Sequence, residues 1–166
     1  MIPDKLLINL KILGKIQKNG RISKSCDGVV SLERDSYLQG LWRTFTNDSR
    51  KQTMYEINNI VNDIQPTLDV IYNSKFMNKD NAYTDVFYKT IEELKMLIDA
   101  MIETGEGLKN LRFTYIQDIN ISAQMDVIIF RVVNLIRDAK QKYSYYCTLV
   151  QMNPVFELEE VTVQSG

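Results

Sequence analysis

The side chains that most often carry out catalysis are missing from this chain or too far apart to cooperate. The 166 residues include no His, which excludes Ser-His-Asp triads, Cys-His dyads and H-E-x-x-H zinc proteases. Cys26 and Cys147 lie 121 positions apart without a C-x-x-C pair, so no structural zinc site is expected within one chain. We expect both cysteines to be reduced, small, buried or half-buried residues of an intracellular protein, although spacing alone leaves open whether they pair.

The carboxylate pairs and the glycine-containing stretch also lack the spacing that chemistry requires. Glu92 and Glu93 point about 100° apart on a helix, so they do not converge as an acid and a base. Glu157, Glu159 and Glu160 are best interpreted as a solvated face. Residues 104–109 contain Gly-x-Gly followed by Lys, but they lack the full phosphate-binding pattern and follow no expected strand. We therefore expect no enzyme, no cofactor and no metal.

The charge is distributed unevenly along the chain. Residues 1–51 carry ten basic and five acidic side chains, whereas residues 52–130 carry six and twelve. Two interpretations of the basic N-terminal part stay open. It contacts nucleic acid or an acidic protein surface, or it is a solvated helix face that meets the acidic middle of its own chain. The nucleic-acid interpretation assigns the contact to Lys11, Lys15, Lys18, Arg21 and Lys24.

Apolar residues recur at three- and four-residue steps along the chain, which predicts helices. These helices would position the charged and polar residues described above. A first helix is predicted over residues 4–18, followed by a stop at which Gly20 is free to take a positive φ. A second helix carries its core residues between Met54 and Ile71 at heptad spacing. Pro66 removes one backbone donor, so a kink or a restart is expected near Gln65.

Two longer helices complete the predicted core. Thr84 or Asp85 caps the third helix. This helix runs to about residue 116 if its heptad register continues, or it stops at Gly105 or Gly107. The register favours continuation. The fourth helix covers about 121–146, and eight of its ten residues at 127–136 are apolar. A helix that is apolar on most sides is typical of the middle of a bundle. Its last turns carry Tyr143, Tyr145 and Tyr146, which suit the end of the bundle or the edge of a partner.

Three short segments outside the long helices are apolar enough to bind a partner. Residues 21–33 alternate around Asp27-Gly28 as a β-hairpin, residues 36–46 form a short aromatic helix, and residues 148–166 form an extended tail that could add an edge strand to a partner. The candidate partner-binding residues are Ile22, Val30, Leu32, Trp42, Phe45, Phe156, Leu158, Val161 and Val163. The fold class is therefore mainly α: an antiparallel bundle of about four helices in one domain over 1–147, with the hairpin at one end.

The order of features over residues 1–64 is informative in itself. A basic apolar helix ends at Asn19-Gly20, a hairpin turns at Asp27-Gly28, and an aromatic helix with Trp42 precedes Asp48-Ser49-Arg50-Lys51. This order resembles small helical proteins of large DNA viruses with AT-rich genomes, and the high use of Ile (18) and Asn (13) is typical of such genomes. The resemblance implies a minor capsid or other virion component, found in the host cytoplasm and in the virion. It carries over no functional residue.

The sequence thus predicts a non-enzymatic structural protein that docks into a larger assembly. Its partners would be other protein subunits, including further copies of itself, and no membrane-spanning run is expected. The alternative prediction is a nucleic-acid-binding protein that uses the basic N-terminal helix and hairpin.

Overall fold

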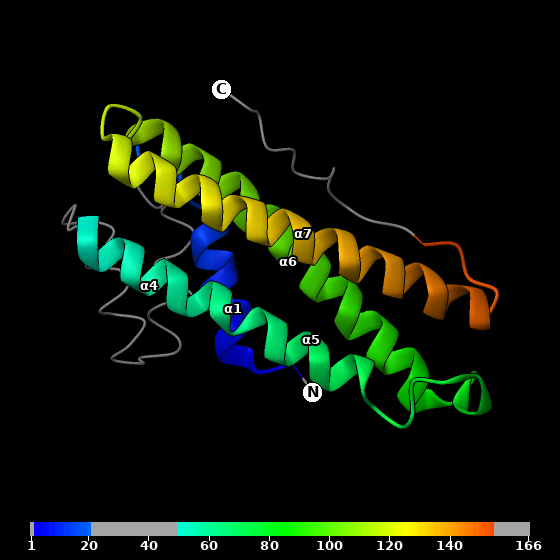
Figure 1. Cartoon of the computed structure of the whole chain (residues 1–166). Coiled ribbons are helices and arrows are strands. Elements are labelled where there is room, and N and C mark those ends of the chain that lie inside the picture. The colour runs from blue at the N-terminus through cyan, green and yellow to red at the C-terminus, as the bar shows by residue number, and fades with distance from the viewer. Residues whose placement is uncertain (1, 21–49, 155–166) are drawn as a thin grey trace.

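The regular elements of the protein are helices wherever the computed structural model describes the chain, which is over residues 2–20 and 50–154 (Figure 1). These elements are α1 (Asp4–Gly14), α4 (Arg50–Asn62), α5 (Ile64–Tyr72), a 3₁₀ turn (Lys79–Asn81), α6 (Asp85–Thr114) and α7 (Ile119–Leu149). The mainly α class is therefore confirmed. The predicted hairpin over 21–33, the aromatic helix over 36–46 and the tail beyond residue 154 lie outside the described residues.

Helix α1 is shorter than the sequence predicts, because it ends at Gly14 rather than at residue 18. The chain then tightens, with Lys15 N donating to Ile12 O at 3.1 Å and Ile16 N to Leu13 O at 3.3 Å. It turns at Gly20, whose φ of +76° confirms the predicted left-handed conformation. Beyond Gly14, the backbone carbonyls of this segment accept hydrogen bonds from side chains of α6, which replaces further helical bonding.

The predicted break near Pro66 is confirmed. Helix α4 ends at Asn62 and α5 restarts at Ile64, with Asp63 between them. Pro66 then lies in the first turn of α5. The N–H groups of a first turn have no acceptor within the helix, so the missing N–H of Pro66 removes no hydrogen bond from α5. The α4 end is held to α7 by Arg131 Nη2, which donates to Asn62 Oδ1 at 2.6 Å.

Helices α6 and α7 form an antiparallel pair joined by a short turn (Figure 1). Thr84 Oγ1 caps α6 by accepting from Phe87 N, and Asp118 caps α7 by accepting from Ile121 N. Helix α6 continues through Gly105 and Gly107 to Thr114, which confirms the continuing register. The heptad spacing of this helix predicts core positions at Phe87, Ile91, Leu94, Ile98, Met101, Gly105, Leu108 and Tyr115. The first seven are buried, and Tyr115 is half-buried against the core.

The C-terminal end of α7 lies three residues beyond the predicted one and closes with a Schellman motif. Met152 N donates to Cys147 O at 2.9 Å and Gln151 N donates to Thr148 O at 3.3 Å, with Gln151 at a φ of +57°. Val150 is buried and Met152 packs against the core. The chain is thereby fixed to the end of the helix pair as far as Met152.

The helices share one hydrophobic core. Helix α6 packs against α7 along one side and against α1 along another, and α7 also contacts α4 and α5. Leu10, Ile57, Leu68, Phe87 and Val132 are all fully buried, so each of the packed elements contributes to the core. This shared core holds the surfaces of α6 and α7 in fixed positions.

Candidate docking surface

The contact between α1 and α6 is made by small and polar residues on α6 that approach the α1 backbone. Gly107 touches the carbonyl of Leu13, and a Cβ there would overlap the Leu13 oxygen. One turn on either side, the single hydroxyl proton of Thr104 is shared between Leu10 O at 2.9 Å and Ala100 O of its own helix at 2.8 Å, and Asn110 Nδ2 donates to Ile16 O at 2.9 Å. We call Thr104, Gly107, Asn110 and Thr114 the α6 seam.

The seam fixes where the segment after α1 lies. Thr114 Oγ1 donates to Lys18 O at 2.8 Å, so the backbone of Lys18 is anchored beside the end of α6. The Lys18 side chain stays exposed. A basic side chain from the N-terminal part of the chain is therefore held next to the turn that joins α6 to α7.

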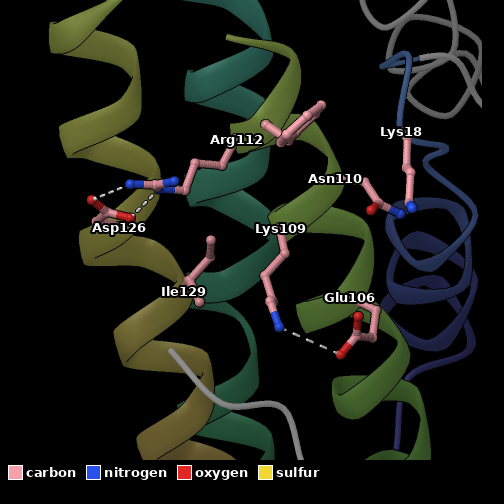
Figure 2. Close-up of a pocket in the computed structure, with 8 residues that line it drawn as sticks. Lys18, Glu106, Lys109, Asn110, Arg112, Asp126 and Ile129 are labelled. Carbon is pink, nitrogen blue, oxygen red and sulfur yellow. Dashed lines mark hydrogen bonds and ion pairs between the residues drawn. The ribbon is translucent and has the colours of Figure 1, made fainter. Parts of the chain in front are cut away.

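A groove lies beside this anchored lysine, between α6 and α7 (Figure 2). Its volume is about 280 Å³, which suits one or two large side chains better than a typical small-molecule ligand. Phe113, 63% exposed, and Ile129 provide apolar lining. The remaining lining residues are Lys18, Glu106, Lys109, Asn110, Arg112 and Asp126.

Ion pairs neutralise part of the charge in the groove. Arg112 reaches from α6 across to Asp126 of α7, and Lys109 Nζ lies 3.9 Å from Glu106 Oε1 on its own helix (Figure 2). Lys18 makes no ion pair with a described residue. The groove therefore combines an apolar wall with one more basic than acidic group.

A second surface runs along the outside of α7, and we call it the α7 outer stripe: Ile119, Ala123, Val127 and Phe130. Their steps of four, four and three residues place them on one face of the helix. Ile119 is 81%, Val127 63% and Phe130 57% exposed. The opposite face, which includes Met125, Val132 and Ile136, is buried.

The outer stripe corrects the prediction that α7 is covered on most sides. The run at 127–136 is apolar all round, but only its inner face packs on α6, α4 and α5. Composition indicates that a helix has two apolar faces, but it does not show whether the same chain covers both. The exposed apolar face lies where the sequence analysis placed no partner-binding residue.

The three described lysines of the nucleic-acid alternative are Lys11, Lys15 and Lys18. All three side chains are exposed, and none makes an ion pair with a residue that the structure describes. The described residues therefore give no support to the interpretation that these lysines meet the acidic middle of the chain. Arg21 and Lys24 lie outside the described residues.

The predicted partner-binding residues lie outside the described residues, so they stay predictions. They are Ile22, Val30, Leu32, Trp42, Phe45, Phe156, Leu158, Val161 and Val163. Apart from Lys18, which was predicted as a nucleic-acid contact, the residues of the groove and of the outer stripe were not predicted from the sequence as binding residues. For the stripe, a usable signal was the spacing of Ile119, Ala123, Val127 and Phe130 opposite a regular core face.

The tyrosines at the end of α7 belong mainly to the core. Tyr143 and Tyr146 are buried, and the Tyr146 ring packs edge-on against Phe87 with centroids 6.1 Å apart, whereas Tyr145 is exposed. Burial raises the pKa of Tyr146, with a further contribution from Tyr145. These residues therefore close the end of the helix pair.

Cys147 is fully buried and carries a free thiol. Burial raises its pKa, a hydrogen bond from Tyr143 lowers it in part, and Glu92 raises it further. A buried thiol with a raised pKa is a poor nucleophile at neutral pH. This agrees with the prediction of a reduced, buried cysteine at this position.

The carboxylates and the Gly-x-Gly stretch are the other candidates for chemistry in the described part of the chain. Among those residues, no group of three or more His, Cys, Asp or Glu could hold a metal ion. The Gly-x-Gly stretch at 104–109 lies inside α6, where Gly107 serves the contact with α1.

Among the described residues, one helix, α7, is long and apolar enough to cross a membrane. This judgement rests on length and composition alone. The core helix of a soluble protein passes the same test, and α7 buries one face against three other helices. The expectation of no membrane-spanning segment stays a prediction.

Comparison with known proteins gives no relative. No family model matches the chain, and neither a curated protein nor a solved structure matches it.

Proposed function

We propose that this chain is a non-enzymatic assembly protein, a helical-bundle module that docks onto other protein subunits through the outer stripe of α7. The observation that carries the proposal is the exposure of Ile119, Val127 and Phe130 opposite a complete buried face. The resemblance described above supports a minor capsid or other virion component as the setting. The proposal assigns no catalytic step, because the chain has no His and its described cysteine is buried.

The outer stripe has the properties of a protein-binding surface. Its three large side chains would each contribute about 1–2 kcal/mol when a partner covers them. They stand on a helix that is fixed by its own core, so docking does not require α7 to order first. Polar residues such as Gln124 and Asn134 flank the stripe, which is the usual arrangement of an apolar centre and a polar rim.

The experiment compares two matched double variants. Val127→Asp with Phe130→Ser disrupts the stripe, and Val70→Asp with Phe76→Ser makes the same changes at exposed positions on α5 and in the loop that follows it. A tagged chain is expressed in its native cells, and the lysate is separated on a density gradient. We expect wild type and the control variant in fast-sedimenting particles and the stripe variant at the position of a free 19.3 kDa chain.

Two results would contradict the proposal. Wild type that sediments only as a free chain shows no assembly, and a stripe variant that stays with the particles shows docking elsewhere. A third arm mixes the purified chain with phospholipid vesicles before flotation. Flotation with vesicles that the stripe variant loses, without any particle association, would assign the stripe to a membrane surface instead.

Nucleic-acid binding is the second candidate, favoured by the three exposed lysines without a described acidic partner. Affinity for duplex or single-stranded DNA should fall steeply with salt, and Lys11→Gln, Lys15→Gln and Lys18→Gln together should reduce the salt slope by about 2–3. Fluorescence anisotropy between 20 and 200 mM salt measures both quantities. The absence of binding at the lowest salt would remove this candidate.

A further inference from the structure

We propose that the groove between α6 and α7 binds the C-terminal segment of a second copy of this chain, residues 155–163. Copies of the chain would then associate head to tail. This inference rests on the proposed function, because it names one partner of the assembly protein and the site at which that partner docks.

The chemistry of the groove matches the chemistry of the segment. The segment alternates apolar residues with acids: Phe156, Leu158 and Val161 are interleaved with Glu157, Glu159 and Glu160. The groove offers Phe113 and Ile129 as apolar lining and Lys18, Lys109 and Arg112 as basic groups. Its volume of about 280 Å³ accommodates one or two of the large side chains.

The charges also favour an acidic occupant. Lys18 has no described ionic partner, and the Lys109–Glu106 pair at 3.9 Å is long and exposed on the acidic side. Exposed pairs of this kind contribute little, so exchange of the partner of Lys109 costs little. Arg112 remains paired with Asp126 and keeps the two walls of the groove together.

The reach of the chain indicates a second copy rather than the same one. Met152 is fixed to the end of α7 by its hydrogen bond to Cys147 O. Cys147 and Ile129 are 18 residues apart on one helix, which corresponds to about 27 Å. Phe156 follows Met152 by four residues and reaches at most about 14 Å from it. Leu158 reaches about 21 Å. The segment therefore places its first two large side chains in the groove only from a neighbouring copy.

A contact between the groove of one copy and the tail of the next is heterologous, so a pair of copies still has one free groove and one free tail with which to bind further copies. Such contacts build a closed ring or an open filament, according to the rotation between copies. This property suits a protein whose proposed role is assembly.

The test uses the full chain and sedimentation equilibrium at low and high salt. Lys18→Glu with Lys109→Glu reverses two charges of the groove, and Lys79→Glu with Lys89→Glu makes the same change at exposed lysines outside it. We expect wild type and the control to self-associate at low salt and the groove variant to associate at least tenfold more weakly. Lys18→Glu alone, which leaves the Lys18 carbonyl bonded to Thr114, should give an intermediate effect.

A mixing experiment identifies the occupant. Glu157→Lys with Glu159→Lys disables the tail and leaves the groove intact. Each disabled variant alone should be monomeric, but a mixture of the groove variant and the tail variant should form a complex that stops at one copy of each. A chain that carries all four substitutions should regain self-association, because both charge sets are reversed.

Several results would overturn the inference. These are a monomeric wild type at every concentration and salt, self-association that the tail variant retains, and a mixture that forms no complex. A segment that occupies the groove of its own chain would give the first of these results, a monomeric wild type, together with a mixture that still forms a complex. None of these results affects the density-gradient test of the outer stripe. Each of the two proposals can therefore be contradicted independently of the other.

Discussion

Helix α6 is covered along its seam by α1, whereas the outer stripe of α7 has no cover from the packed helices. The seam brings two backbones together at Gly107 and Leu13, and polar side chains complete it by donating to carbonyls at 2.8–2.9 Å. The stripe presents Ile119, Val127 and Phe130 without such polar contacts. One surface requires a single partner in a single register, and the other accepts any apolar partner of suitable shape.

The difference shows how the chain separates folding from docking. A polar donor aimed at a backbone carbonyl is specific, and a buried carbonyl that loses its partner costs about 1–3 kcal/mol, so the seam is suited to permanent contact. An exposed apolar side chain on a rigid helix imposes little penalty while it is free and contributes when it is covered. We therefore expect substitutions at the seam to lower stability and substitutions at the stripe to leave it nearly unchanged.

The largest effect is expected at the seam, from Gly107→Ala. The new Cβ would overlap the Leu13 oxygen and lie 2.7 Å from its carbonyl carbon, so α1 must move away. We expect the free energy of unfolding to fall by about 3 kcal/mol, although alanine is the better helix former. Urea denaturation followed by circular dichroism measures it. Gly14→Ala, which would meet Glu103 Cβ at 2.9 Å, should cost less. Equal or greater stability of Gly107→Ala would contradict the close approach.

A smaller loss is expected from Thr104→Val, which keeps the shape and removes the hydroxyl. The lost hydrogen bond to Leu10 O should lower the free energy of unfolding by about 1 kcal/mol. The matched control is Thr90→Val, because Thr90 is also buried on α6 but bonds only Val86 O of its own helix. Amide hydrogen exchange in α1 should accelerate for Thr104→Val alone. Equal acceleration in both variants would show that Thr104 does not hold α1.

Alkaline pH should weaken the far end of the helix pair and spare the seam. Burial raises the pKa of Tyr72, Tyr146 and Cys147. The unfolded chain loses these protons at lower pH than the folded chain does, so their contribution to stability is complete below about pH 8 and falls as pH rises, first through Cys147 and then through the tyrosines. Urea denaturation at several pH values measures the fall, and Tyr146→Phe should reduce it. The cost of Thr104→Val should not change with pH, because the seam has no ionisable side chain; a cost that varies would contradict this.

The smallest effect on stability is expected from Val127→Asp with Phe130→Ser. Both side chains are exposed in the free chain, so the free energy of unfolding should change by no more than about 0.5 kcal/mol. The same urea experiment measures it. A loss of several kcal/mol would mean that the stripe is part of the core and would remove the contrast with the seam.

The sequence predicted the inner faces of the helices well. The heptad positions from Met54 to Ile71 and from Phe87 to Leu108 are buried because periodic spacing follows directly from helix geometry. The break at Pro66 and the cap at Thr84 were also predictable, because each depends on residues within one turn.

The surfaces that distinguish this protein were not predictable in the same way. Thr104 and Leu10 are 94 positions apart, and periodicity shows which face of a helix is buried but not which helix it meets. The end of α1 at Gly14 was also unpredictable because it depends on a contact between residues far apart in the sequence. Side chains of α6, rather than N–H groups of a longer α1, donate to the carbonyls beyond Gly14. The apolar run at 127–136 was interpreted as a helix in the middle of the bundle, because the sequence alone does not show how many other helices pack around it.

The most direct test of the central claim is thiol labelling at position 127 in free and assembled chains. Val127→Cys and, as the control, Val70→Cys are each placed in a Cys26→Ser background, where Cys147 is buried. We expect a maleimide to label both positions rapidly in the free chain and, in the particle fraction, to label position 70 but not position 127. Equal labelling of the two positions in the particles would contradict the account that the outer stripe of α7 is the docking surface.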